Sequence, residues 1–140
     1  MTRGTVYAIV YIMASKKPKR LIMVIEDDRT LQFTLRTVLE KAGYEVLSAE
    51  SAEDASKQLK THRPDLVYLD ILLPGMSGLD LLEKMRAQKS LQSTPVFILT
   101  QFHNEEYRRR ARDLKAMHYF VKAEYGLAEI MKATSEALVK

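Results

Sequence analysis

Five side chains able to bind a metal ion or react with phosphate stand at the ends of apolar segments in this sequence. Glu26 and Asp27 follow LIMVI, Asp70 follows LVYL, Thr100 closes PVFILT, and Lys122 follows HYFV. Carboxylates that face one another repel, and each resists ionisation unless a cation lies between them. The ligands are hard oxygen atoms without His or Cys, so the pattern favours Mg²⁺ over zinc.

Such a set suits the transfer of a phosphoryl group to a carboxylate. Asp70 is the candidate nucleophile, because aspartate forms acyl phosphates in several enzyme classes. One Mg²⁺ and the ammonium of Lys122 would balance the formal charge of the three carboxylates. The ion and the lysine would also offset charge on the transferring group, and the Thr100 hydroxyl would hydrogen-bond a phosphoryl oxygen.

Strand-like and helix-like segments alternate from residue 21 onward and must position these side chains. Three of the strand segments are almost continuously apolar, which is typical of parallel strands covered on both faces. The five predicted strands are residues 21–26, 45–50, 65–70, 95–100 and 118–122. Helices are predicted in the gaps and after the last strand, so the fold class is α/β with a doubly wound, five-stranded parallel sheet. The carboxyl ends of such strands meet at one edge, where we expect the candidate residues to converge.

Local signals mark where several of these helices begin and end. Ser51 and Ser77 each precede an acidic residue three positions on, a pattern typical of a helix N-terminus. Asp28 is interpreted as a helix-start residue rather than as a further metal ligand. Gly43 suits the position just past a helix C-terminus. The strand 45–50 is weakly apolar, and we expect it at an edge of the sheet.

Length and composition predict one globular domain over residues 21–140, preceded by an extension over residues 1–20. Of the 140 residues, 46% are hydrophobic and 29% charged, which is ordinary for a globular protein. The absence of cysteine excludes disulfides and fits a cytoplasmic setting. Five of the 22 basic side chains and none of the 18 acidic ones lie in residues 1–20, so residues 21–140 carry a net charge of −1. No direct nucleic-acid partner is therefore expected.

Three interpretations of residues 1–20 stay open. The stretch TVYAIVYIM could form an extra strand or dock against a partner, or it could belong to a signal peptide, although no clear cleavage site follows it. In the interpretation that we favour, the natural start is Met13 and the upstream residues are a start-site artefact. The apolar run 6–14 is far shorter than the roughly 20 residues of a membrane-spanning helix, and no membrane partner is expected.

Four motifs in order make the chain from about residue 21 to 139 resemble the receiver domain of two-component response regulators. They are IEDD at 25–28, LDILLPGMSG at 69–78, ILT at 98–100 and YFVK at 119–122. The resemblance implies a flavodoxin-like (βα)5 fold with strand order 2-1-3-4-5. It also implies a stand-alone, single-domain response regulator rather than an enzyme, whose only chemistry is its own phosphorylation and dephosphorylation.

The same resemblance implies roles for single residues. Asp70 would accept the phosphoryl group from a histidine kinase or a histidine phosphotransfer protein. Asp27, Asp70 and the backbone carbonyl of Leu72 would bind Mg²⁺, with Glu26 acting through a water molecule. Lys122 would contact the phosphoryl group.

Thr100 and Tyr119 would form a switch pair, in which the hydroxyl moves toward the phosphate and the aromatic ring follows it inward. The surface of the fourth helix (about 104–115), the fifth strand (118–122) and the fifth helix (carrying Leu127 to Leu138) would report the change. An unknown downstream protein would bind there, and a phosphorylation-dependent homodimer is a further option.

The sequence departs from the family pattern at four positions. Gln101 replaces the small residue that usually follows the switch hydroxyl. Leu72 and Phe102 put apolar side chains where family members influence the water that hydrolyses the phosphoaspartate, so we expect slow self-dephosphorylation. Ala123 replaces the proline that normally follows the lysine through a cis peptide bond. A non-proline cis bond costs about 2.5–4 kcal/mol, and the sequence leaves cis and trans both open here.

Other functions fit the sequence less well. The main alternative is a receiver-like module that binds partners without being phosphorylated, which Gln101 and Ala123 favour and the complete acidic site disfavours. An aspartate-nucleophile phosphohydrolase would commonly carry a second aspartate two residues after the nucleophile, where Leu72 stands. A flavin site is disfavoured because the loop after the first strand is acidic and would repel a phosphate.

Overall fold

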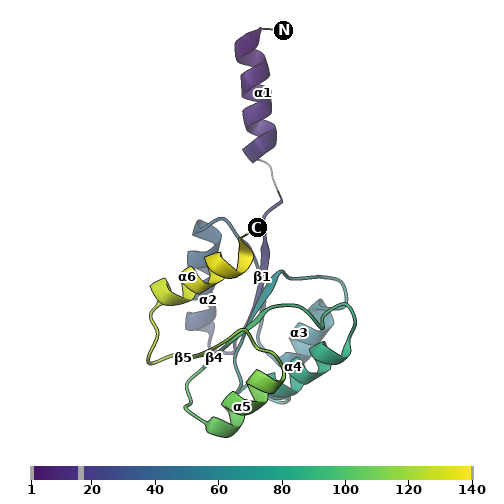
Figure 1. Cartoon of the computed structure of the whole chain (residues 1–140), viewed down its shortest axis with the longest axis vertical. Helices are drawn as coiled ribbons and strands as arrows, with labels where there is room; N and C mark the ends of the chain where they lie inside the picture. The colour runs from purple at the N-terminus through teal and green to yellow at the C-terminus, as the bar shows by residue number, and fades with distance from the viewer. Residues whose placement is uncertain (1, 16–17, 140) are drawn as a thin grey trace.

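Helices and strands alternate along the chain, with one further helix near the N-terminus (Figure 1). The computed structural model describes residues 2–15 and 18–139. Its helices are α1 (Arg3–Ser15), α2 (Arg29–Lys41), α3 (Ala52–Gln58), α4 (Gly78–Ala87), α5 (Glu105–Asp113) and α6 (Leu127–Leu138). Its strands are β1 (Leu21–Ile25), β2 (Glu45–Ala49), β3 (Leu66–Leu69), β4 (Val96–Thr100) and β5 (His118–Val121).

The five strands form one parallel sheet in the order β2-β1-β3-β4-β5. The α/β fold class, the strand order and the edge position of β2 predicted from the sequence are thus confirmed. In the sheet Ile25 pairs with Leu69, and Leu69 pairs with Ile98. The carboxyl ends of the central strands therefore lie side by side, as the predicted site requires.

Helices cover both faces of the sheet, and each face has its own apolar core. Figure 1 shows α2 and α6 on one face and α3, α4 and α5 on the other. The first core contains Tyr68 with Leu35 and Ile130, and the second contains Leu69 with Leu82. Successive residues of a strand point to opposite faces. A strand covered on both faces is therefore apolar throughout, which explains the continuous runs in the sequence.

The predicted helix ends are confirmed. Asp28 is the N-cap of α2, and its side chain accepts hydrogen bonds from the N–H groups of Thr30 and Leu31. Ser51 and Ser77 cap α3 and α4 in the same way. Gly43 follows α2 with a φ of 98°, a left-handed conformation that glycine adopts without steric cost.

Residues Arg3–Ser15 form the helix α1, so the extra-strand interpretation of this segment is wrong. A helix satisfies its own backbone hydrogen bonds, whereas a strand here would need a sheet edge to pair with. Figure 1 shows α1 standing apart from the sheet and its covering helices. Across residues 2–15 and 18–139, no helix has the length and apolar character needed to cross a membrane. The natural start at Met13 stays a prediction.

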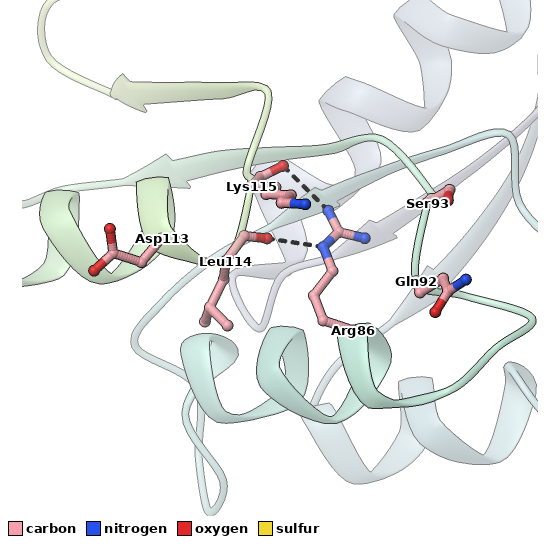
Figure 2. A pocket seen from close by; sticks show the side chains of 6 residues that line it. All are labelled: Arg86, Gln92, Ser93, Asp113, Leu114 and Lys115. Carbon is pink, nitrogen blue, oxygen red and sulfur yellow. Dashed lines mark hydrogen bonds between the residues drawn. The ribbon is translucent and has the colours of Figure 1, made fainter.

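Arg86 on α4 fixes the far end of α5, at the edge of the sheet opposite the strand carboxyl ends. Its guanidinium donates to the carbonyls of Leu114 (2.8 Å) and Lys115 (3.3 Å), which Figure 2 shows, and also to those of Leu91 (3.2 Å) and Thr94 (2.8 Å). Burial of this guanidinium lowers its pKa. One side chain thus joins α4, the loop before β4 and the end of α5.

Candidate functional site

The sheet ladder continues one residue past several strands and holds the candidate residues at one edge. The Glu26 N–H donates to the Ala49 carbonyl at 3.0 Å, and the Asp70 N–H donates to the Ile25 carbonyl at 3.1 Å. The Lys122 N–H donates to the carbonyl of Thr100 at 2.7 Å. Residues far apart in the sequence are therefore positioned by backbone bonds rather than by mobile loops.

The side chains at the ends of these strands converge. Glu26, Asp27 and Asp70 each offer one carboxylate oxygen, and these three atoms lie within 4.8 Å of one another. The Lys122 Nζ lies 2.6 Å from Glu26 Oε1 and 3.4 Å from Asp70 Oδ2. Glu26 and Asp70 are only 3% and 7% exposed, whereas Asp27 faces solvent. The predicted convergence of these four residues is observed.

Burial sets the electrostatics of the cluster. It raises the pKa of Glu26 to about 7, against the opposing effect of the hydrogen bond from Lys122. Burial likewise raises the pKa of Asp70, although the nearby Lys122 charge opposes it. Burial alone would lower the pKa of Lys122, but the hydrogen bond to Glu26 and the charge of Asp70 outweigh it and the pKa is raised. Two buried carboxylates therefore share one ammonium, which leaves a site that attracts a further cation.

The donor set fits Mg²⁺. Three carboxylate oxygens gather within reach of one ion, and the cluster contains neither His nor Cys. They border a cavity of about 300 Å³, lined by Glu26, Asp27, Asp28, Asp70, Leu72, Gln101 and Phe102. This volume exceeds that of an ion and a phosphoryl group, so both can enter without opening the sheet.

Thr100 and Tyr119, the predicted switch pair, are joined through the backbone of Phe102. The Thr100 side chain is buried, and its Oγ1 accepts a hydrogen bond from the Phe102 N–H at 3.4 Å. The Tyr119 hydroxyl donates to the Phe102 carbonyl at 3.0 Å. The guanidinium of Arg108 on α5 lies over the Tyr119 ring, 4.6 Å from its centroid. A shift at Thr100 therefore has a short physical route to β5 and α5.

The four positions that depart from the family pattern all lie at this edge. Leu72 and Phe102 are 47% and 42% exposed and border the cavity together with Gln101. The peptide bond between Lys122 and Ala123 is trans, since residues 2–15 and 18–139 contain no cis peptide. The Lys122 ammonium contacts Glu26 and Asp70 although the peptide bond after Lys122 is trans, so a cis-proline is not needed to orient this side chain.

Sequence reasoning missed two residues that shape the site. Gly78 begins α4 so close to β3 that an added Cβ would lie 1.9 Å from the Asp70 carbonyl oxygen. Gln32 donates from Nε2 to the carbonyls of Glu26 (2.9 Å) and Ala49 (3.2 Å), which anchors α2 to the acidic loop. A glycine at the end of the LPGMSG segment is the signal that could have pointed to the close approach at Gly78, whereas nothing in the sequence marked Gln32.

Comparison with known proteins agrees with this geometry. A family model for the response regulator receiver domain matches residues 22–135. The chain belongs to this family. Receiver domains are the signalling switches of two-component systems, and phosphorylation-dependent signalling and Mg²⁺ binding at an acidic pocket are general to them.

Individual relatives of this receiver domain include longer transcriptional regulators. The alkaline phosphatase synthesis transcriptional regulatory protein PhoP of Bacillus subtilis is 33% identical over 101 residues, which is 72% of this chain and 41% of PhoP. The transcriptional regulatory protein PdtaR of Mycobacterium tuberculosis is 28% identical over 120 residues, 85% of this chain and 57% of PdtaR. The receiver chain thus spans about half the length of these relatives.

Solved structures share the fold. The non-phosphorylated HemR receiver domain of Leptospira biflexa has a TM-score of 0.79 and 29% identity, and the match covers 87% of this chain and 98% of HemR. The phosphorylated cyanobacterial phytochrome response regulator RcpA has a TM-score of 0.77 and 25% identity, with coverage of 85% and 93%.

Proposed function

We propose that Asp70 of this receiver domain accepts a phosphoryl group from a histidine kinase or a histidine phosphotransfer protein. The observation that carries the proposal is the buried Asp70 carboxylate 3.4 Å from the Lys122 ammonium, at a cavity shared with Glu26 and Asp27. A carboxylate that only stabilised the fold would need hydrogen-bond partners but no open cavity lined by further acids. The grouping therefore supports a reaction site.

In the proposed reaction, a carboxylate oxygen of Asp70 attacks the phosphorus atom of a phosphohistidine. The new P–O bond forms as the P–N bond breaks, and the electron pair of the broken bond stays on the imidazole nitrogen of the donor. Lys122 keeps its positive charge at neutral pH, because its pKa is raised. Its ammonium therefore offsets the negative charge of the oxygens that arrive at Asp70.

Asp27, Asp70 and the backbone carbonyl of Leu72 would hold Mg²⁺, with Glu26 acting through a water molecule. The bound ion supplies positive charge beside the transferred group. Within the chain, Thr100 would turn its hydroxyl toward a phosphoryl oxygen and loosen its bond with the Phe102 N–H. The Tyr119 ring, held by the Phe102 carbonyl, would follow.

The proposed output surface consists of α5, β5 and α6. Support comes from the stacking of Arg108 on Tyr119, which joins α5 to β5 at the position where the switch would act. We propose that a downstream protein, or a second phosphorylated copy, binds this surface. We propose further that the protein acts in the cytoplasm as a stand-alone regulator without its own DNA contacts, and that it turns over no separate substrate.

Intact mass spectrometry tests the proposal. After incubation with acetyl phosphate and Mg²⁺, the expected result is a gain of one phosphoryl group, which Asp70→Asn abolishes. Asp113→Asn is the matched control, because its carboxylate is exposed at the end of α5 and should leave the gain unchanged.

Two other outcomes would contradict the proposal. If neither acetyl phosphate nor a panel of histidine kinases phosphorylates the chain, the phosphorylation-independent interaction module is the better account. If the protein instead releases phosphate from an ester with many turnovers, it is an enzyme of the aspartate-nucleophile type.

A further inference from the structure

The helix α1 exposes a large apolar surface. Val6, Tyr7, Ile9 and Val10 are 44%, 71%, 40% and 57% exposed, and the segment from Thr5 to Ala14 contains no charged residue. Helices with this composition are normally covered, because the exposure of apolar side chains to water is energetically unfavourable. Figure 1 places α1 away from the sheet and the other helices, so the body of the chain does not provide the cover.

The charge around α1 restricts what can cover it. Residues 1–20 contain five basic side chains and no acidic one. A second copy of the helix would bring two cationic segments together, which is unfavourable. The rest of the chain has a net charge of only −1 and attracts the segment weakly. The matching partner is therefore both apolar and negatively charged.

We propose that α1 and the basic residues that follow it bind the surface of an anionic lipid membrane. The 13 residues of α1 extend about 20 Å, less than the hydrocarbon thickness of about 30 Å, so the helix lies at the surface and does not span. Tyr7, which is exposed, suits the headgroup region, where aromatic side chains concentrate. The apolar side chains of the helix would be buried at the membrane interface, and the basic cluster would add attraction to anionic headgroups.

Membrane attachment goes beyond the proposed function and does not depend on phosphorylation. It also departs from two sequence-based expectations, that of no membrane partner and that of a natural start at Met13, because it requires α1 (Arg3–Ser15) to belong to the native chain. Arg20 forms an ion pair with Asp65 at 3.4 Å, so the test leaves it in place and replaces the three lysines of the sequence segment 16–19, Lys16, Lys17 and Lys19.

Co-sedimentation of the full chain with vesicles tests the inference. Vesicles of phosphatidylcholine with a third of phosphatidylglycerol should pull down the protein, whereas pure phosphatidylcholine should retain much less. Replacing the three lysines by Gln should weaken partitioning about a hundredfold, at roughly fivefold per lysine. Val10→Glu, which puts an acid into the apolar surface, should abolish it.

A matched control replaces Lys41, Lys60 and Lys89 by Gln, since these side chains are exposed on the receiver body. This control should bind like the wild type, and circular dichroism should find every variant folded. Equal binding to both vesicle types, or equal loss in the control, would overturn the inference. A lack of binding to anionic vesicles would also overturn the inference. If the protein does not bind them and instead forms a dimer that Val10→Glu disrupts, α1 is a dimerisation helix and the inference is wrong.

Discussion

Replacing Gly78 by Ala should destabilise the domain and damage the acceptor site together. The added Cβ would lie 1.9 Å from the Asp70 carbonyl oxygen, and real Cβ atoms do not approach below 3.0 Å, so backbone must move by at least 1.1 Å. The three nearest heavy atoms belong to the backbone of Asp70 and Ile71, which cannot rotate away as a side chain does. The strain therefore falls on the end of β3 and the start of α4.

The magnitude follows from two contributions. Overpacking costs about 1–3 kcal/mol, and loss of the 2.8 Å hydrogen bond from the Gly78 N–H to the Ile71 carbonyl costs about 1 kcal/mol. We expect Gly78→Ala to lower the free energy of unfolding by about 2–4 kcal/mol in urea titrations followed by circular dichroism. Phosphorylation by acetyl phosphate should also slow, because the Asp70 backbone is displaced.

Gly126→Ala is the matched control for this experiment. No heavy atom lies within 4 Å of its added Cβ, and its φ is −82°, which any residue adopts. Its free energy of unfolding should change by less than about 1 kcal/mol. If Gly78→Ala were as stable as Gly126→Ala and were phosphorylated at the wild-type rate, the steric reasoning would be refuted.

Three further predictions concern stability, metal binding and the lifetime of the phosphorylated form. Arg86→Lys keeps the charge but loses the planar set of donors that reaches four carbonyls. It should lower the free energy of unfolding, measured in urea, by about 2 kcal/mol, and an unchanged midpoint would contradict this. Because burial raises the pKa of Glu26 to about 7, protons should compete with Mg²⁺ below that pH. Calorimetry should therefore find Mg²⁺ binding about tenfold weaker at pH 6 than at pH 8. Equal affinities at the two pH values would contradict a role of Glu26 in metal binding. The exposed apolar side chains of Leu72 and Phe102 at the cavity offer no hydrogen bond to a water molecule that would attack the phosphoaspartate. Release of phosphate should therefore take minutes or longer, and a half-life of seconds would exclude this explanation.

The convergence of the site could be predicted because it depends on topology alone. In a parallel sheet the strand carboxyl ends share one edge, so Asp70 and Lys122 meet although 52 residues separate them. Likewise the caps at Asp28 and Ser51 follow from local hydrogen bonds between a side chain and the next backbone N–H groups. Such features need no knowledge of side-chain packing.

Other features depend on distances that no sequence pattern contains. The need for Gly78 arises from the approach of α4 to β3, and the role of Arg86 arises from carbonyls on two separate segments, the loop before β4 and the end of α5. The pKa of Glu26 depends on how deeply its carboxylate is buried. The segment of α1 was ambiguous because a short apolar run fits a strand and a helix equally well.

The most direct test of the central claim is to identify the residue that carries the phosphoryl group. Borohydride reduces an aspartyl phosphate to homoserine, which peptide mass spectrometry then locates in the chain. After reaction with acetyl phosphate and Mg²⁺, the account predicts homoserine at the position of Asp70 alone. Homoserine at another acidic residue, or phosphate on a histidine or a hydroxyl group, would contradict it.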